Sequence, residues 1–136
     1  MNEPVLVDSN VILDIFTVDP QWFDWSATSL QRAIDSGTAV INPIVYAEVS
    51  VYFSAIEELD IALPPDRFRR DPLPWPAAFL AGKAYGLYRR NSGAKRSPIP
   101  DFYIGAHAAV AGFRLLTRDP RLYRSYFPTV NVISPA

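Results

Sequence analysis

Residues 4–10 are Pro4-Val5-Leu6-Val7-Asp8-Ser9-Asn10, a short apolar run that ends in an acid and two small polar residues. A short apolar run bounded by polar residues is typical of a strand that is buried on both faces, as in a parallel sheet. Serine and asparagine favour the start of a helix. The stretch therefore predicts a buried strand with Asp8 at its carboxyl end, followed by a short helix over residues 11–16.

The alternation of strand and helix signals continues through the rest of the chain. Further apolar runs that predict strands are Thr38–Ile41, Leu115–Thr117 and Val130–Ile133. Helices are predicted over about residues 20–36, 42–56 and 76–90, from residue 98 onward, and in a short segment after residue 119. Gly37 is a C-terminal signal for the first of these, and Asn42-Pro43 is a strong N-terminal signal for the second. The proline-rich stretch 60–76 predicts a loop or a broken element.

Strands that alternate with helices predict an α/β fold with a mostly parallel sheet, in one domain that spans residues 1–136. In open parallel sheets, ligands bind beyond the carboxyl ends of the strands, where the strand order reverses. Asp8 and the turn Thr117–Asp119 both lie at such ends. This edge of the sheet is therefore the first candidate for a functional site.

The composition excludes several kinds of chemistry. Cysteine is absent and His107 is the only histidine, which rules out disulfides, thiol chemistry and the usual zinc sites. No apolar run is long enough to cross a bilayer, and the N-terminus lacks the basic start of a signal peptide. We therefore expect a cytoplasmic protein without a membrane partner, in which any metal is a hard ion with oxygen ligands.

Four acids are candidates for such a metal site: Asp8, Glu48, Asp101 and Asp119. Each has an ordinary explanation on its own. Asp8 and Asp101 could cap or stabilise helix N-termini, and Asp119 precedes Pro120 in a common turn pattern. Together, the four carboxylates are the kind of set that binds Mg²⁺ or Mn²⁺ and presents it to a phosphodiester. We predict that they form one catalytic and metal-binding cluster.

The charges are divided unevenly along the chain. Residues 1–68 carry eleven acids and two arginines, whereas residues 69–136 carry eleven bases and three acids. This asymmetry suggests a polyanionic partner such as RNA, although simple solvation of the surface explains it about equally well. The bases that we expect to contact RNA phosphates are Arg89, Arg90, Lys95, Arg96 and Arg118. A further basic set, Arg114, Arg121 and Arg124, is interleaved with Tyr123 and Tyr126, which could stack on bases.

Four segments of the chain resemble a known family. They are Val7-Asp8-Ser9-Asn10-Val11, Asn42-Pro43-Ile44-Val45-Tyr46-Ala47-Glu48, Pro100-Asp101-Phe102-Tyr103-Ile104-Gly105-Ala106-His107-Ala108 and Leu116-Thr117-Arg118-Asp119-Pro120. In this order, over nearly the whole chain, they resemble the signature blocks of PIN-domain nucleases. The resemblance is closest to the VapC-type toxins of bacterial toxin–antitoxin pairs.

The resemblance implies a five-stranded parallel sheet sandwiched between helices. It also implies an Mg²⁺- or Mn²⁺-dependent endoribonuclease that acts as the toxin of a type II pair. By the same resemblance, Asp8, Glu48, Asp101 and Asp119 are the metal-binding acids, and Asn10 and Thr117 are polar residues that support the site. The implied partners are RNA, a cognate antitoxin and a second copy of the chain in a homodimer.

Two other functions remain open at this stage. A magnesium-dependent phosphoryl-transfer domain also places an aspartate after its first strand, but the segment Asp8-Ser9-Asn10 lacks the second acid of a phosphatase motif, and no lysine follows Lys95. A non-catalytic RNA-binding PIN-like protein would be expected to have an incomplete set of acids. Of the remaining polar residues, we expect His107 to have a packing or surface role and Asp14 to lie at the surface or just behind the site.

Overall fold

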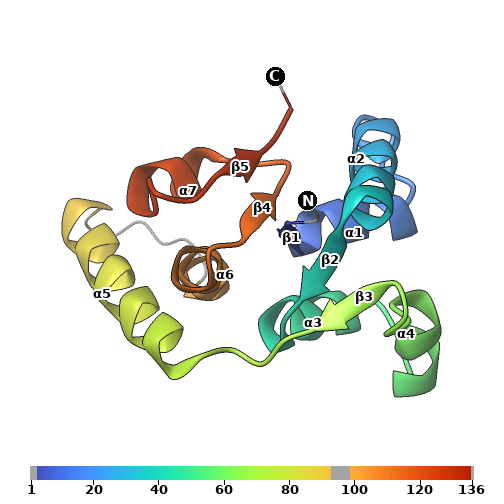
Figure 1. Ribbon diagram of the computed structural model, residues 1–136, viewed down its shortest axis with the longest axis horizontal. Helices are drawn as coiled ribbons and strands as arrows, with labels where there is room; N and C mark the ends of the chain where they lie inside the picture. Colours follow the sequence, from blue (N-terminus) through green and yellow to red (C-terminus); the bar gives the residue numbers. More distant parts are fainter. Residues whose placement is uncertain (1–2, 93–98, 136) are drawn as a thin grey trace.

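The computed structural model describes residues 3–92 and 99–135, and its centre is a five-stranded parallel sheet (Figure 1). The strands are β1 (Pro4–Val7), β2 (Thr38–Ile41), β3 (Phe68–Arg70), β4 (Arg114–Leu116) and β5 (Val132–Ile133). Their order across the sheet is β3-β2-β1-β4-β5, and every neighbouring pair is parallel. The predicted α/β fold with a parallel sheet is confirmed.

Helices cover both faces of this sheet. They are α1 (Ser9–Phe16), α2 (Phe23–Ser36), α3 (Pro43–Ser50), α4 (Ile56–Ala62), α5 (Trp75–Ser92), α6 (Ile99–Ala111) and α7 (Arg121–Tyr126). In Figure 1, α5, α6 and α7 lie on one side of the sheet and α2 lies on the other. Among the described residues, no helix has the length and hydropathy needed to cross a bilayer.

β1 is the central strand and the most deeply buried one. Leu6 pairs with Val40 of β2 on one side, and Val7 pairs with Leu116 of β4 on the other. The side chains of Leu6 and Val7 are fully buried, as expected for an apolar run in the middle of a parallel sheet. The chain passes from β1 to β2 and β3 in one direction and returns to β4 and β5 in the other. The strand order therefore reverses between β1 and β4.

The start of α1 differs from the prediction. Ser9 and Asn10 were expected to precede the helix as capping residues, but they form its first turn, and Asp8 occupies the N-cap position. The side chains of Ser9 and Asn10 form hydrogen bonds with groups outside the helix. Local capping is replaced here by tertiary contacts.

The predicted helix over residues 42–56 was too long, and the helix α4 was not predicted. The stretch 60–76, predicted as a loop or a broken element, is a broken element: it holds the end of α4, the short strand β3 and the start of α5 between loops. Asn42 does cap α3, because its Oδ1 accepts a hydrogen bond from the Val45 N–H at 2.9 Å. The helix ends at Ser50, and a turn then brings Phe53 against the ring of Phe16 before α4 begins. β3 lies inside the proline-rich stretch; it was missed because three residues are too few to show an alternating pattern.

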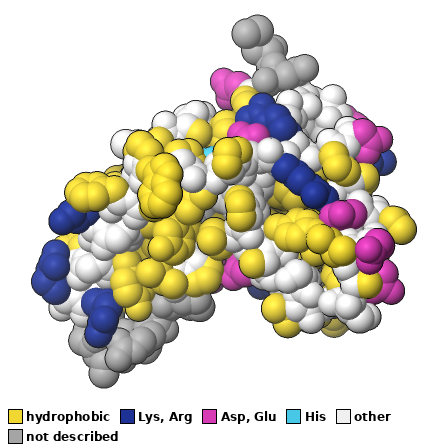
Figure 2. Space-filling view, turned by 90° about the horizontal axis from the view of Figure 1, so that it is seen from below, with side chains coloured by type: hydrophobic (Ala, Val, Ile, Leu, Met, Phe, Trp, Pro, Cys, Tyr) yellow, Lys and Arg dark blue, Asp and Glu magenta, His cyan; other side chains and the backbone are white. Residues whose placement is uncertain are grey.

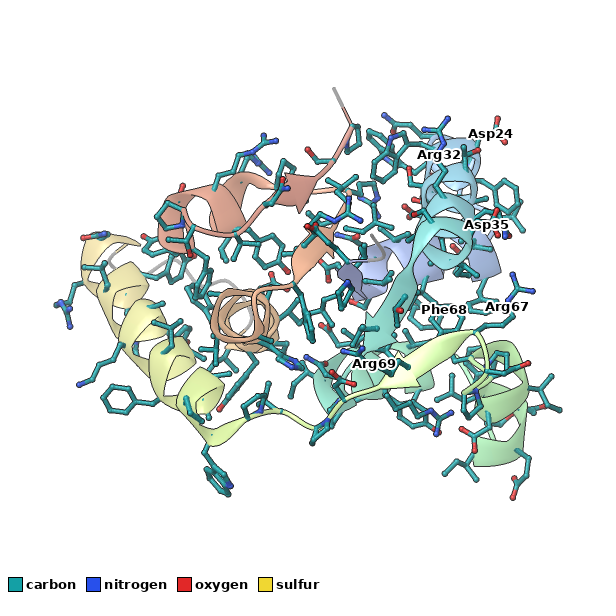
Figure 3. All side chains as sticks on the ribbon, viewed as in Figure 1. Asp24, Arg32, Asp35, Arg67, Phe68 and Arg69 are labelled. Atoms are coloured by element: carbon teal, nitrogen blue, oxygen red, sulfur yellow. The ribbon has the colours of Figure 1, made fainter. Side chains whose placement is uncertain are left out.

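Only the first residue of the short β3 strand is buried. Phe68 is buried and pairs with Ala39 of β2, whereas Arg69 is exposed at the edge of the sheet (Figure 3). The other differences are small shifts of element ends: α2 begins at Phe23, and β5 is limited to Val132–Ile133. Such shifts are usual for boundaries predicted from sequence.

Candidate active site

Asp8 lies directly after β1, beside the end of β4, and is 3% exposed. Its backbone N–H donates to the carbonyl of Leu116 at 2.9 Å. Its carboxylate oxygen Oδ2 accepts hydrogen bonds from the hydroxyls of Thr117 and Tyr123, both at 2.8 Å, and from the amide of Asn10 at 3.4 Å. Asp8 makes no side-chain capping bond to α1, so capping does not explain this acid.

A second set of hydrogen bonds holds the loop after β4 beside Asp8. The hydroxyl oxygen of Thr117 accepts from the backbone N–H of Asp119 and from the side-chain amide of Asn10, both at 3.2 Å. The side-chain oxygen of Asn10 accepts from the backbone N–H of Arg118 at 3.2 Å. Asn10 and Thr117 thus connect Asp8 to the loop that carries Asp119.

Glu48 approaches the same edge of the sheet from α3. The hydroxyl of Ser9, the residue next to Asp8, donates to Oε1 of Glu48 at 2.8 Å. Glu48 is half-buried, so this hydrogen bond ties α3 to the start of α1 in a partly dry environment. Packing between α1 and α3 supports the same placement.

Asp101 and Asp119 complete the cluster around an open cavity of about 360 Å³. Asp101 lies in the first turn of α6 and is partly buried, whereas Asp119 is more exposed and lies 3.3 Å from the guanidinium of Arg121. The polar part of the cavity wall includes Asp8, Asp101 and Asp119. The rest comes mainly from α7 together with Tyr88: Tyr88, Arg121, Leu122, Tyr123, Ser125 and Tyr126.

The electrostatics of the cluster are those of crowded carboxylates. Burial raises the pKa of Asp101 to about 7, and the charges of Asp8, Glu48 and Asp119 add to that rise. Burial also raises the pKa of Asp8, against the hydrogen bonds from Tyr123 and Thr117. The pKa of Glu48 is raised by burial and by the charge of Asp8, although the Ser9 hydroxyl opposes the shift. The four predicted acids therefore lie close enough to influence one another.

This donor set fits a hard divalent cation. All four side chains offer oxygen, and a cation would relieve the repulsion that raises the pKa of Asp101. Within residues 3–92 and 99–135, no group of three or more acidic or histidine side chains is arranged to hold one metal ion together. Mg²⁺ commonly uses one or two carboxylates and keeps several waters, which two of these acids could supply. Direct contact of all four acids with one ion stays a prediction.

The raised pKa of Asp101 predicts how the stability of the metal-free protein depends on pH. The folded protein holds this proton more tightly than the unfolded chain, so its contribution to stability is greatest below about pH 4 and is lost as pH rises towards 7. Asp101→Asn should remove this loss. Because the carboxylate faces an open cavity, we expect a gain of about 1–2 kcal/mol in the free energy of unfolding at pH 8, and little gain at pH 4.

Urea unfolding in the presence of a chelator, at both pH values, measures this effect. Asp24→Asn is the matched control, because Asp24 is an exposed acid on α2, far from α6 (Figure 3). A loss of stability in Asp101→Asn at pH 8 would show instead that Asp101 serves mainly to stabilise the N-terminus of α6.

The predicted RNA-contacting bases are placed differently from one another. Arg89 and Arg90 are exposed in the last turn of α5. Lys95 and Arg96 lie outside the described residues. The guanidinium of Arg118 binds the carboxylate of Asp14 through two hydrogen bonds, at 2.8 and 2.9 Å.

Two other predictions are decided by burial. Asp14 is 2% exposed and pairs with Arg118, which excludes the surface alternative and agrees with a position just behind the site. His107 is buried and its Nδ1 lies 3.0 Å from the side-chain amide of Asn42, which confirms a packing role.

The sequence did not reveal the parts played by Tyr123 and Ser9. Tyr123 was considered as a surface for stacking, but it is buried and its hydroxyl binds Asp8. The charge of Asp8, together with burial, raises the pKa of Tyr123 well above its ordinary value. Nothing in the local pattern of α7 distinguishes this tyrosine from Tyr126. Ser9 had a weak signal, namely its position next to Asp8.

Comparison with known proteins agrees with the fold. The family model described as PIN domain matches residues 5–128. VapBC2 from Rickettsia felis, solved bound to a DNA fragment from their promoter, has a TM-score of 0.69 and 18% identity over 96% of this chain and 98% of that chain. FitAcB from Neisseria gonorrhoeae has a TM-score of 0.66 and 21% identity over 95% of this chain and 96% of that chain. A toxin–antitoxin complex from Klebsiella pneumoniae has a TM-score of 0.65 and 20% identity over 97% of this chain and 98% of that chain.

No curated protein matches the sequence. The identities to the solved structures are low, so these likenesses establish the fold alone. The match of the family model covers most of the chain and does not depend on them.

Proposed function

Because the chain belongs to the PIN domain family, we propose that it is an endoribonuclease that depends on Mg²⁺ or Mn²⁺ and acts as the toxin of a type II toxin–antitoxin pair. The observation that carries the proposal is the convergence of Asp8, Glu48, Asp101 and Asp119 at the point where the strand order reverses. Each acid comes from a different part of the chain. Four mutually repelling carboxylates are unfavourable to hold close together unless a cation or a reaction uses them.

The residues of the cluster have separate tasks in this proposal. Asp8 is the most firmly held acid, since three side chains donate to its Oδ2, and its other carboxylate oxygen receives none of these three bonds. We assign that second oxygen, together with Asp101 and Asp119, to cation binding, with one or two of them in direct contact and the others acting through the water molecules of the ion. We place Glu48 behind Asp8 as a further negative charge. When bound, a divalent ion supplies positive charge against the phosphate oxygens and activates a water molecule as the nucleophile.

Several features near the cavity support an RNA substrate. Arg121 lies on its wall and provides a positive charge for a backbone phosphate. Tyr88 and Tyr126 line the same cavity, and their rings meet edge to face at 5.7 Å. An unpaired base could stack against such aromatic side chains. The bases Arg89, Arg90, Lys95 and Arg96 remain predicted contacts with the RNA backbone, whereas the guanidinium of Arg118 is already paired with Asp14.

The proposed protein partners are a cognate antitoxin and a second copy of the chain. The three similar solved structures named above are VapBC2, FitAcB and a toxin–antitoxin complex. Their likeness to this chain supports an antitoxin partner. A homodimer needs an apolar surface, and Figure 2 shows hydrophobic side chains spread over the side of the molecule that carries α5. Trp75, Phe79 and Leu87 are the large exposed ones on that helix. A cytoplasmic location is part of the same proposal, because the expected substrate is cellular RNA.

The test is direct cleavage. We expect the purified chain to cut total RNA at defined positions in the presence of Mg²⁺ or Mn²⁺, and excess chelator to stop the reaction; sequencing of the new RNA ends measures both. Cleavage that continues unchanged in chelator would rule out metal dependence. RNA binding with no new ends under any of these conditions would favour the non-catalytic alternative.

A further inference from the structure

Arg118 and Asp14 form an ion pair just behind the site. Two guanidinium nitrogens of Arg118, Nε and Nη2, donate to the two carboxylate oxygens of Asp14 at 2.8 and 2.9 Å. This two-point geometry fixes the direction of both side chains, which a single contact would not do. The Asp14 side chain is almost fully buried, and about a third of the Arg118 side chain is exposed.

Each partner of the pair is held by other contacts as well. The hydroxyl of Ser26 on α2 donates to Oδ2 of Asp14 at 2.8 Å. The guanidinium of Arg118 lies over the ring of Trp22, 5.7 Å from its centroid. The pair therefore joins α1, α2 and the loop after β4 at one point, and the positive charge of Arg118 is already balanced by a buried carboxylate.

The position of Arg118 in the chain gives this pair its importance. Its neighbours are Thr117, which donates to Asp8, and Asp119, which lines the cavity. Its own backbone N–H donates to Asn10, whose amide reaches both Asp8 and Thr117. The loop 117–119 is thus bound to α1 through the backbone N–H of Arg118, through the Thr117 hydroxyl and through the Arg118 side chain.

We propose that the Asp14–Arg118 ion pair is a positioning device that holds Thr117 and Asp119 in the geometry the cluster needs for metal binding. This inference rests on the proposed function, because it assigns Arg118 to the organisation of that site rather than to RNA contact. Neither Asp14 nor Arg118 contacts the cation; both act through the loop. Residues that orient metal ligands are known to affect metal affinity without touching the metal.

The test uses two variants of the full chain and one matched control. Arg118→Lys keeps the charge but loses the two-point geometry. The double variant Asp14→Leu with Arg118→Met removes both charges together, so that no buried charge is left without a partner. Arg69→Lys is the control, because Arg69 forms a pair of similar two-point geometry with Asp71 at 2.8 Å, at the exposed edge of the sheet.

Two readouts are measured for every variant. Isothermal titration with Mn²⁺ gives metal affinity, and we expect about tenfold weaker binding in both Arg118 variants and no change in Arg69→Lys. Hydrogen exchange of the backbone amides of Arg118 and Asp119, measured without metal, should become faster in both variants while the exchange of β1 amides stays the same. A purely structural role would lower the melting temperature without this local pattern.

The outcomes separate the two proposals. Wild-type Mn²⁺ affinity and amide exchange in Arg118→Lys and in the double variant would overturn the positioning role, whether or not the protein cleaves RNA. If the wild type neither binds Mn²⁺ nor cleaves RNA, but the amides of the loop still exchange faster in both variants, the proposed function fails and the ordering of the loop by the ion pair stands. Slower cleavage with unchanged Mn²⁺ affinity and unchanged amide exchange would rule out the positioning role and would indicate that Arg118 contacts RNA directly.

Discussion

Asp8→Asn should lower kcat/KM for RNA cleavage by more than about 100-fold, which exceeds the loss typical of residues that only orient a metal ligand. An asparagine can still accept hydrogen bonds from Thr117 and Tyr123 through its side-chain oxygen, and it has nearly the same volume. What it loses is the negative charge next to the cavity. The rate of cleavage at saturating Mg²⁺, with metal affinity measured in parallel, is the appropriate measurement.

A stability measurement and a control variant accompany the Asp8→Asn experiment. The melting temperature without metal should equal or exceed that of the wild type, because a buried carboxylate is replaced by a neutral group. Asp35→Asn removes an exposed charge on α2, far from the cavity (Figure 3), and should cleave RNA at the wild-type rate. Wild-type activity in Asp8→Asn would end the assignment of this cluster as the active site.

Phe102→Ala should destabilise the fold by about 3–5 kcal/mol, the usual cost of truncating a fully buried aromatic residue. The Phe102 ring is completely buried between α5, α6 and the C-terminal segment. Four rings contact it at centroid distances of 5.2–6.2 Å: Tyr85, Tyr88, Tyr126 and Phe127. The residue also follows Asp101, so its loss weakens the packing that positions one of the four acids.

The shift in the midpoint of urea unfolding, converted with a shared slope, measures this cost. Tyr52→Ala is the matched control: its side chain is 60% exposed in the turn after α3, and we expect a change within about 0.5 kcal/mol. Equal midpoints for the two variants would mean that the aromatic cluster around Phe102 contributes little to stability.

The parts of this fold that could be predicted are those with strong local signals. The apolar run at β1 predicted a buried strand, and Asn42-Pro43 predicted the start of α3. β3 could not be predicted, because it is a strand only by virtue of its pairing with β2, and its own residues are too few to show a period. The end of α3 at Ser50 is set by the packing of Phe53 on Phe16, which is a tertiary contact.

The candidate site follows the same division. The four acids could be named because together they form a set of carboxylates that suits a hard metal ion, and because the segments that carry them resemble a known family. The hydrogen bond from Tyr123 to Asp8 spans 115 positions in the chain, and no local pattern indicates such a partner. The environment of the Arg118 side chain could not be predicted from the sequence. A basic residue beside an active site is usually expected to face solvent, but Arg118 faces a buried aspartate.

The central place of β1 has a consequence for the timing of activity during synthesis. Asp8 is made more than 100 residues before its partners Thr117 and Tyr123. A nascent chain that has emerged only as far as α6 has no fourth strand beside β1, and therefore no closed set of carboxylates. The proposed nuclease therefore lacks its complete site until β4 and α7 have been made.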